Sequence, residues 1–474
     1  MTIFLRKDIY IYMITGLIMG IIVPFLGIYS LGLIAVALGL YVFYKIQLNG
    51  KTASILVVAL LYANFLRPIG GSKFILLAVD IFIFCVIIKH VFIVGIKKEK
   101  LLLLGIVSCF VFLSFVQMFN PNIPSFMAGF EGFRKTSFAL LLFYLGALAF
   151  NDAKEARRFF VVLSLFSTPV LLYGIKQYLF LSNFDMLYIG ANDADIYTGM
   201  LFGKPRATSI FAGPFHFGMF GAVLAVVNLF LMDTAKRRGH KFWFFILLAI
   251  SLFGCYSSLT RTNLVALFIA LISYKILANI KRFVFVFPII SVILIFSMNY
   301  IISVSDKLIY STNGLLRMIG TISNFSNDTR LQGRTHGWEV IQGLVKEHPI
   351  VAYGTGSAGD TLQNTYAFQY HATSHNYFLK LLMETGVIGF LLIVILFIAL
   401  IGLMLKKIFN ETNKLNKRLI VCSLSVFSIF LVNTMVNSTI ETYPVSGLIF
   451  LILGIALIKF KKDEAEEDTS LLKS

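Results

Sequence analysis

Charged residues are scarce in this sequence of 474 residues, since Asp, Glu, Lys and Arg make up only 14% of it. Soluble globular domains carry about 25% of these residues. Hydrophobic residues reach 58%, and they gather in runs near the ~20 residues that cross a bilayer as a helix. The sequence therefore excludes a soluble protein and predicts an all-α polytopic membrane protein with about 12–14 transmembrane helices. Such runs include residues 101–119, 242–259, 283–302 and 390–405.

Cysteine is rare, and the common catalytic motifs are missing. The four cysteines lie in apolar runs without CxxC spacing, so we interpret them as buried side chains rather than disulfides or metal ligands. The sequence contains neither HExxH nor GxxxxGK[ST], which argues against a zincin or a P-loop enzyme. His371 and His375 are four residues apart, as in a zinc site, but no third ligand is evident. We predict no metal and no cofactor.

The net charge of +18 does not indicate nucleic-acid binding, because no basic–aromatic platform or nucleic-acid motif accompanies it. Most Lys and Arg residues fall in short loops, as the positive-inside rule expects of the cytoplasmic side. The N-terminus is then inside, with an uncleaved first span that starts at Ile9, and the long polar segment 303–374 is outside. The short loops predicted inside are residues 45–51, 97–100, 151–158, 233–241, 275–282 and 406–418.

The hydropathy pattern divides the chain into four parts. One large extracytoplasmic loop contains an amphipathic helix over residues 334–347, with Trp338, Ile341 and Val345 on one face and His348-Pro349 as its end. Such a helix lies on the outer membrane surface or caps a cavity. The predicted parts are an N-terminal transmembrane bundle (1–302), this loop (303–374), the C-terminal transmembrane helices (375–460) and a charged cytoplasmic tail (461–474).

His375 is the leading candidate for a catalytic residue, because it stands where the polar loop meets an apolar helix. Ser374 is expected to cap that helix, which places His375 in the first turn, where free N–H groups favour phosphate. A neutral imidazole there could accept a proton from an attacking hydroxyl. The alternative is a histidine that only caps the helix.

Three further residues of the same helix complete this pattern. Gly386 and Gly389 are three residues apart, so they share a helix face that lets another helix or a lipid chain approach closely; alternatively they only pack. Glu384 either orients the base or pairs with Lys380 at the i,i+4 spacing, and pairing is the favoured interpretation.

Arginines near the ends of apolar runs are the candidates for phosphate binding. Arg206 precedes the span that contains Pro214 and His216, Arg261 separates two apolar runs, and Arg334 lies in the long loop. The guanidinium group matches phosphate oxygens in a bidentate manner, and a buried arginine is costly without a task. The alternative is that these side chains snorkel to the lipid headgroups.

Together these residues resemble the O-antigen ligase and O-antigen polymerase superfamily. The family motif is His, then Asn, Ser or Gln, nine residues, and Gly-x-x-Gly, which here reads His375, Asn376, Gly386 and Gly389. The resemblance implies an all-helical membrane glycosyltransferase of the C type, which works without metal. It also implies that His375 is the base, that Arg261 clamps a diphosphate, and that Arg206 and Arg334 assist the leaving group.

The implied function is a polysaccharide polymerase of the bacterial cytoplasmic (inner) membrane. It would join polyprenyl-diphosphate-linked oligosaccharide units to an acceptor glycan at the extracytoplasmic side, with inversion at the anomeric carbon. A flippase and a chain-length regulator are the candidate protein partners. Two alternatives remain: a ligase that uses lipid A core or a protein as acceptor, and a lipid-linked glycan transporter, for which repeats and midplane acids would be expected.

Overall fold

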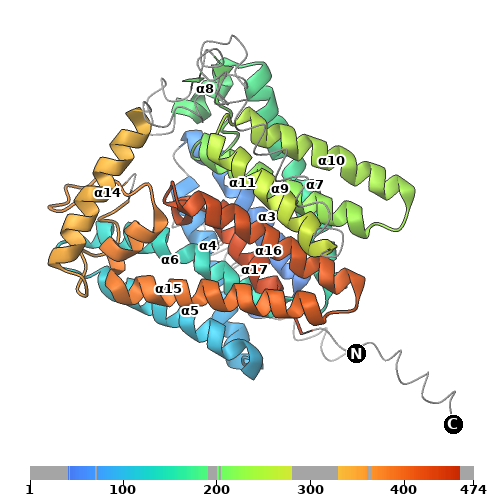
Figure 1. Ribbon diagram of the computed structural model, residues 1–474, viewed down its shortest axis with the longest axis horizontal. Coiled ribbons are helices and arrows are strands. Elements are labelled where there is room, and N and C mark those ends of the chain that lie inside the picture. Colours follow the sequence, from blue (N-terminus) through green and yellow to red (C-terminus); the bar gives the residue numbers. More distant parts are fainter. Residues whose placement is uncertain are drawn as a thin grey trace, which may run out of the picture.

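The computed structural model of the protein describes residues 41, 43–69, 72–190, 200–201, 204–279, 329–359, 362 and 365–459. These residues form a bundle of α-helices with one two-stranded antiparallel hairpin (Figure 1). In chain order the elements are α3 (Gly50–Tyr62), η1 (Ala63–Ile69), α4 (Ser72–Val94), α5 (Lys98–Gln117), α6 (Phe126–Ala149), α7 (Ala153–Leu179), α8 (Asn183–Gly190), β1 (Met200–Leu201), β2 (Lys204–Pro205), α9 (Pro214–Thr234), α10 (Arg238–Ser257), α11 (Arg261–Ala278), α14 (Thr329–Glu347), α15 (Tyr377–Asn410), α16 (Lys414–Thr434), η4 (Thr439–Glu441) and α17 (Val445–Ile455).

Eight of the described helices are long and apolar enough to cross a membrane. They are α4, α5, α7, α9, α10, α11, α15 and α16, and they confirm the prediction of an all-α polytopic membrane protein. The first predicted span, which starts at Ile9, and the run 283–302 lie outside the described residues. The range of 12–14 spans therefore stays a prediction, as does the division of the chain into four parts.

The core of the bundle is formed by α9 and α17, whose surfaces are largely covered by other helices. Small residues allow this close packing. A Cβ atom added to Gly146 in α6 would lie 2.0 Å from the carbonyl oxygen of Leu451 in α17, and one on Gly454 would lie 2.3 Å from that of Phe143. Glycine at such contacts lets membrane helices approach each other's backbones.

Basic side chains lie together at one end of the bundle. Lys407, in the last turns of α15, donates to the carbonyl oxygens of Ala456 and Ile458 at 2.8 and 2.9 Å. Lys100, at the start of α5, donates to the carbonyl oxygen of Ala147. We call this end the basic end, and the opposite end, at which α15 begins, the site end. The turn from α15 to α16 lies at the right of Figure 1, and α14 lies at the left.

Contacts between loops that are distant in sequence support the predicted alternation of the chain. At the basic end, Glu155 accepts from the backbone N–H of Gly50 at 2.9 Å, and Arg157 donates to the hydroxyl of Thr234 at 3.2 Å. These contacts join the turns at 45–51, 151–158 and 233–241, which were predicted to share one side of the membrane. The described part of the long polar loop lies at the opposite end.

The amphipathic helix of the polar loop is α14, and it begins earlier than predicted. The helix runs from Thr329 rather than residue 334, and it ends at Glu347, directly before His348, as expected. Ile341 is fully buried and Val345 packs beside it, so the predicted face faces the protein. Figure 1 shows α14 covering the site end of the bundle at its left edge.

Candidate functional site

The residue that caps α15 is Asn376, so the prediction that Ser374 is the N-cap was wrong. The Asn376 side-chain oxygen accepts from the backbone N–H groups of Phe378 and Leu379 at 2.9 and 3.1 Å. Its amide nitrogen donates to the carbonyl oxygen of Met435 at 3.1 Å. Asn376 thus both starts α15 and attaches it to the end of α16.

Ser374 has a tertiary role instead of a capping role. Its buried hydroxyl lies 2.7 Å from the hydroxyl of Ser438 and donates to the carbonyl oxygen of Ala358 at 3.2 Å. Both partners belong to segments that are distant in sequence. The Ser374 hydroxyl is directed to these segments, and the side chain of Asn376 takes the capping position instead.

His375 lies between Ser374 and Asn376, which are both bonded to distant segments, and it has a strained backbone. Its φ is +40°, a region that costs an L-residue about 1–2 kcal/mol. Bonds from Ser374 on one side and Asn376 on the other hold this conformation. The imidazole is half-exposed, so it is accessible from outside the bundle. Strain that the surroundings impose on an accessible residue is common at functional sites.

Helix α14 lies directly against the segment that carries His375. The indole N–H of Trp338 donates to the carbonyl oxygen of Ser374 at 2.7 Å. A Cβ atom on Gly337 would lie 2.6 Å from the carbonyl oxygen of Thr373, so only glycine allows this approach. Arg334 precedes Gly337 and Trp338 by three and four residues and shares their helix face. The structure therefore brings half-exposed Arg334 to the side of α14 that faces the His375 segment.

The loops that carry Arg206 and Arg261 are bonded to each other. Arg206 Nε donates to the carbonyl oxygen of Ser258 at 3.4 Å, and the backbone N–H of Ala207 donates to the carbonyl oxygen of Ser257 at 3.1 Å. Arg261 is the first residue of α11, three residues after Ser258. Both arginines are half-exposed, and we call the two bonded loops that carry them the arginine rim.

This rim lies at the site end, as the packing of α11 against α16 indicates. Tyr274, late in α11, donates to Asp233 at 3.2 Å, and Arg418, early in α16, contacts the same carboxylate at 3.0 Å. The two packed helices therefore run antiparallel. Arg261, at the start of α11, lies beside the end of α16, to which Asn376 attaches the His375 segment. The structure therefore places the four residues predicted to carry the chemistry at the same end of the bundle.

Glu384 belongs to a buried ionic cluster. Lys380 Nζ lies 2.5 Å from Glu384 Oε1, which confirms the favoured i,i+4 pair, and 2.7 Å from Glu441 Oε1. Glu384 also accepts from the hydroxyl of Thr136 at 2.8 Å and from the backbone N–H of Gly356 at 2.9 Å. Lys380 and Glu384 are fully buried, so Glu384 connects three segments of the protein rather than facing a substrate.

The two glycines of the motif do not share a helix face, which corrects the prediction. Gly386 has φ +68° and ψ −173°, and it interrupts α15. This conformation is essentially restricted to glycine. A Cβ atom there would lie 2.6 Å from the carbonyl oxygen of Ile350 and 2.9 Å from that of Pro349. Gly389 instead faces Thr385 of its own helix and Leu113 of α5. Gly386 therefore admits the backbone that follows α14.

Two tyrosines of the polar loop, Tyr353 and Tyr366, have raised pKa values. Burial raises the pKa of Tyr366, and a hydrogen bond to the carboxylate of Glu131 raises it further. Burial likewise raises the pKa of Tyr353, as does the nearby carboxylate of Glu347. Both hydroxyls thus stay protonated at neutral pH and can donate. His371 Nε2 lies 2.9 Å from the carbonyl oxygen of Gly359, so this ring contacts the loop backbone.

A comparison with known families assigns the segment that contains most of this site. Residues 246–394 match the family model described as O-antigen ligase. The chain carries an O-antigen ligase domain. This match confirms the resemblance stated from the His375 motif, and it supports in general a membrane-enzyme function of the O-antigen ligase or polymerase type. No curated protein matches the sequence.

The O-antigen ligase domain does not contain the whole site end. Arg206 and Glu441 lie outside residues 246–394, yet both are bonded to residues within it. The sequence patterns did not indicate Glu441, Lys135 or Gln177 as residues of the site end. Gln177 is buried and its side chain bonds the backbone of Thr208 and Ser209, which holds the segment after Arg206. Their partners are far along the chain, so no local spacing could indicate them.

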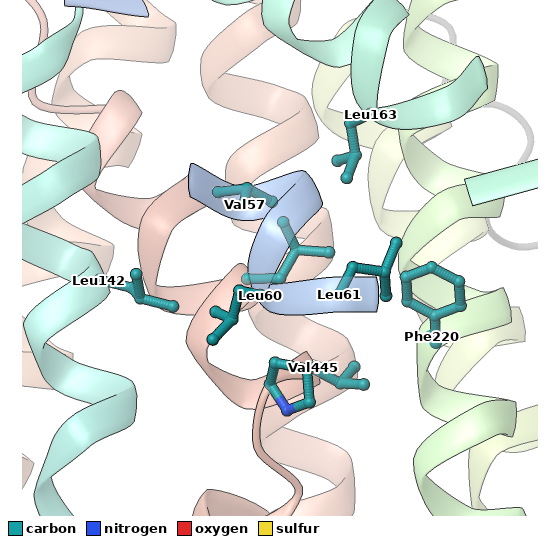
Figure 2. A pocket seen from close by; sticks show the side chains of 9 residues that line it. Val57, Leu60, Leu61, Leu142, Leu163, Phe220 and Val445 are labelled. Carbon is teal, nitrogen blue, oxygen red and sulfur yellow. The ribbon is translucent and has the colours of Figure 1, made fainter. Parts of the chain in front are cut away.

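An apolar cavity inside the bundle is not part of the candidate site. Its lining side chains are aliphatic or aromatic, and they converge from α3, α6, α7, α9 and α17 (Figure 2). Its volume of about 20 Å³ is enough for roughly one water, but the lining offers no polar partners for it. The residues that line it are Val57, Leu60, Leu61, Leu142, Leu163, Phe220, Pro444, Val445 and Leu448.

Proposed function

We propose that the protein is a polysaccharide polymerase that transfers polyprenyl-diphosphate-linked oligosaccharide units onto a growing glycan. The observation that supports this most is the location of strained, accessible His375 at the same end of a membrane bundle as Arg206, Arg261 and Arg334. An imidazole can act as a base near neutral pH, and guanidinium groups are suited to a diphosphate.

The transfer step follows from these roles. The imidazole of His375 takes the proton of the acceptor hydroxyl, and the oxygen attacks the anomeric carbon of the donor sugar. The bond between that carbon and the diphosphate oxygen breaks, and the diphosphate leaves with the electron pair. The arginines neutralise the charge that develops on it. Backside attack inverts the configuration at the anomeric carbon, and the polyprenyl diphosphate remains in the membrane.

We further propose that the site end faces outward from the bacterial cytoplasmic membrane. The concentration of basic residues at the opposite end supports this orientation. A flippase would then deliver the lipid-linked donor, and a chain-length regulator would act on the product. Metal and cofactor have no role in the proposed step.

The test is a transfer assay with the purified protein in lipid vesicles and a polyprenyl-diphosphate oligosaccharide. A polymerase produces longer glycans and releases polyprenyl diphosphate. Movement of unaltered lipid-linked glycan between leaflets would instead indicate a transporter and reject the proposal. The matched control is His375→Ala, which should lose both products.

A second candidate is a ligase that uses the same chemistry, and the description of the matched family favours it. The two activities differ only in the acceptor. Addition of lipid A core or of a hydroxyl-bearing acceptor protein to the same assay separates them. Transfer of one glycan to that acceptor, without elongation of the lipid-linked glycan, would establish the ligase.

A further inference from the structure

The short helix η4 lies where the His375 segment and the arginine loops meet. On one side, Ser438, which precedes η4, contacts the hydroxyl of Ser374 at 2.7 Å. On the other side, the ring of His216 in α9 interacts with the backbone of Glu441. The segment around His216 is bonded in turn to the Arg261 helix, because Asn263 donates to the carbonyl oxygen of Phe215 at 2.8 Å.

Glu441 connects η4 to the start of α15 through an ion pair. Its carboxylate lies 2.7 Å from Nζ of Lys380, and its side chain is only 10% exposed. Lys380 lies one helical turn after Asn376, so this pair fixes the first turns of α15 directly behind His375. A Cβ atom on Gly359 would lie 3.1 Å from the Glu441 carboxylate. Glu441 is thus enclosed between η4, α15 and the polar loop.

The arrangement of charges around Lys380 makes the connection between η4 and α15 depend on the carboxylate of Glu441. One ammonium, Lys380, serves two carboxylates, Glu384 and Glu441, and the ammonium of Lys135 is close enough to interact with Glu441. Glu384 also bonds to Thr136 and Gly356, so loss of Glu441 leaves the pair of Lys380 and Glu384 intact. Only the connection between η4 and α15 would be weakened.

We infer that Glu441 is a positioning residue that, through Lys380 and η4, holds the His375 base in register with the arginine-bearing loops. This inference rests on the proposed glycosyl transfer. Glu441 touches no reacting atom. Transfer requires that the base contacts the acceptor hydroxyl while the arginines bind the diphosphate of the donor. A displacement of one of these groups by about 1 Å can lower the rate on the order of 100-fold.

The kinetic test compares Glu441→Gln and Glu441→Asp with the wild type in vesicles. Gln has the same shape without the charge, and we expect kcat to fall about 10- to 100-fold while KM for the lipid-linked donor stays within about twofold. Asp keeps the charge and should recover part of the loss. The matched control is Asp233→Asn, which removes a carboxylate from a cation at the basic end and should leave both constants unchanged.

A second measurement reports the register without relying on activity. The Ser374 and Ser438 hydroxyls are 2.7 Å apart, so Ser374→Cys with Ser438→Cys should form a disulfide on mild oxidation. This pair is made in a chain whose Cys85 and Cys109 are replaced by alanine. We expect rapid cross-linking with Glu441 present and clearly slower cross-linking with Glu441→Gln.

The outcomes separate this inference from the proposed function. Lower kcat, recovery by Asp and slower cross-linking support it. Unchanged kcat, a change confined to KM, or unchanged cross-linking would overturn it. If wild type transfers no glycan at all, the proposed function fails and the catalytic part of the inference falls with it. The cross-linking rate then decides whether Glu441 sets the position of η4.

Discussion

The two ends of the bundle use buried and half-buried charge in different ways. At the basic end, cations bond to free carbonyl oxygens: Lys407 to Ala456 and Ile458, and Lys89 to Phe43, Tyr44 and Ile46. Lysines near helix C-termini satisfy carbonyls and oppose the helix dipole. At the site end, Lys380 serves two carboxylates instead. The same residue type thus bonds carbonyl oxygens at one end and carboxylates at the other.

Backbone strain follows the same division. Within the described part of the chain, four residues other than glycine have positive φ: Ser209, Leu259, Ala352 and His375. All four lie in loops of the site end, next to Arg206, Arg261, α14 and α15. Strained backbone persists only where surrounding contacts impose it. The four strained residues other than glycine therefore lie where the proposed function needs fixed loop conformations, at the site end.

The sharpest test of this contrast exchanges histidines at the two ends for alanine. His375→Ala removes the proposed base, and general-base catalysis contributes about 100- to 10,000-fold, so we expect glycan elongation to fall by at least about 100-fold with normal membrane levels. His240, exposed at the start of α10 at the basic end, is the control, and His240→Ala should be as active as wild type. Full activity of His375→Ala would reject the base role.

Replacement of arginine by lysine should also separate the two ends. Arg261→Lys keeps the charge but loses the planar fork that binds two phosphate oxygens, so kcat/KM should fall about 10- to 100-fold. Arg418→Lys, at the basic end, still places a cation beside Asp233 and should leave the rate unchanged. Steady-state kinetics with the lipid-linked donor measures both. Equal rates for both variants would mean that Arg261 only reaches the lipid headgroups.

Alanine substitutions at two glycines of α15 test whether the backbone at Gly386 is restricted to glycine. Gly386→Ala puts a methyl group in a glycine-only conformation, 2.6 Å from the carbonyl oxygen of Ile350. We expect a loss of about 2 kcal/mol or more in the free energy of unfolding and several-fold lower activity. Gly402, later in the same helix, has no atom within 4 Å of its added Cβ, so Gly402→Ala should be neutral or stabilising by up to about 1 kcal/mol. Thermal unfolding in detergent compares them, and equal melting temperatures would contradict the strain.

Local sequence features predicted what depends on near neighbours. The spacing of Lys380 and Glu384 indicated their ion pair, and His348-Pro349 correctly marked the end of α14. The apolar runs indicated the membrane helices because their length alone matches the bilayer. In each case the residues that determine the feature lie within one helix or directly next to it in the sequence. The fold class and the candidate base were therefore accessible from the sequence.

Contacts between distant segments explain what local patterns could not predict. Ser374 and Asn376 are both good N-caps, and the choice between them depends on Ser438, 64 residues away from Ser374. The sequence around Gly386 predicts a regular helix, but the carbonyl oxygens of Pro349 and Ile350, which pack against Gly386, are distant in the sequence. The start of α14 was likewise missed because Thr329 carries no apolar signal. The bonds between the loops that carry Arg206 and Arg261 likewise join distant parts of the sequence, so no local pattern could predict them.

The smallest effect is expected for an exposed ion pair at the basic end. Lys459 contacts Glu99, and both side chains are more than half exposed. Such pairs contribute little because water solvates both partners, so Lys459→Gln should change neither the melting temperature nor glycan elongation. The measurement is the same vesicle assay and thermal scan used for the site-end variants. A clear loss of activity would show that this end also controls transfer, and the division between the site end and the basic end would no longer hold.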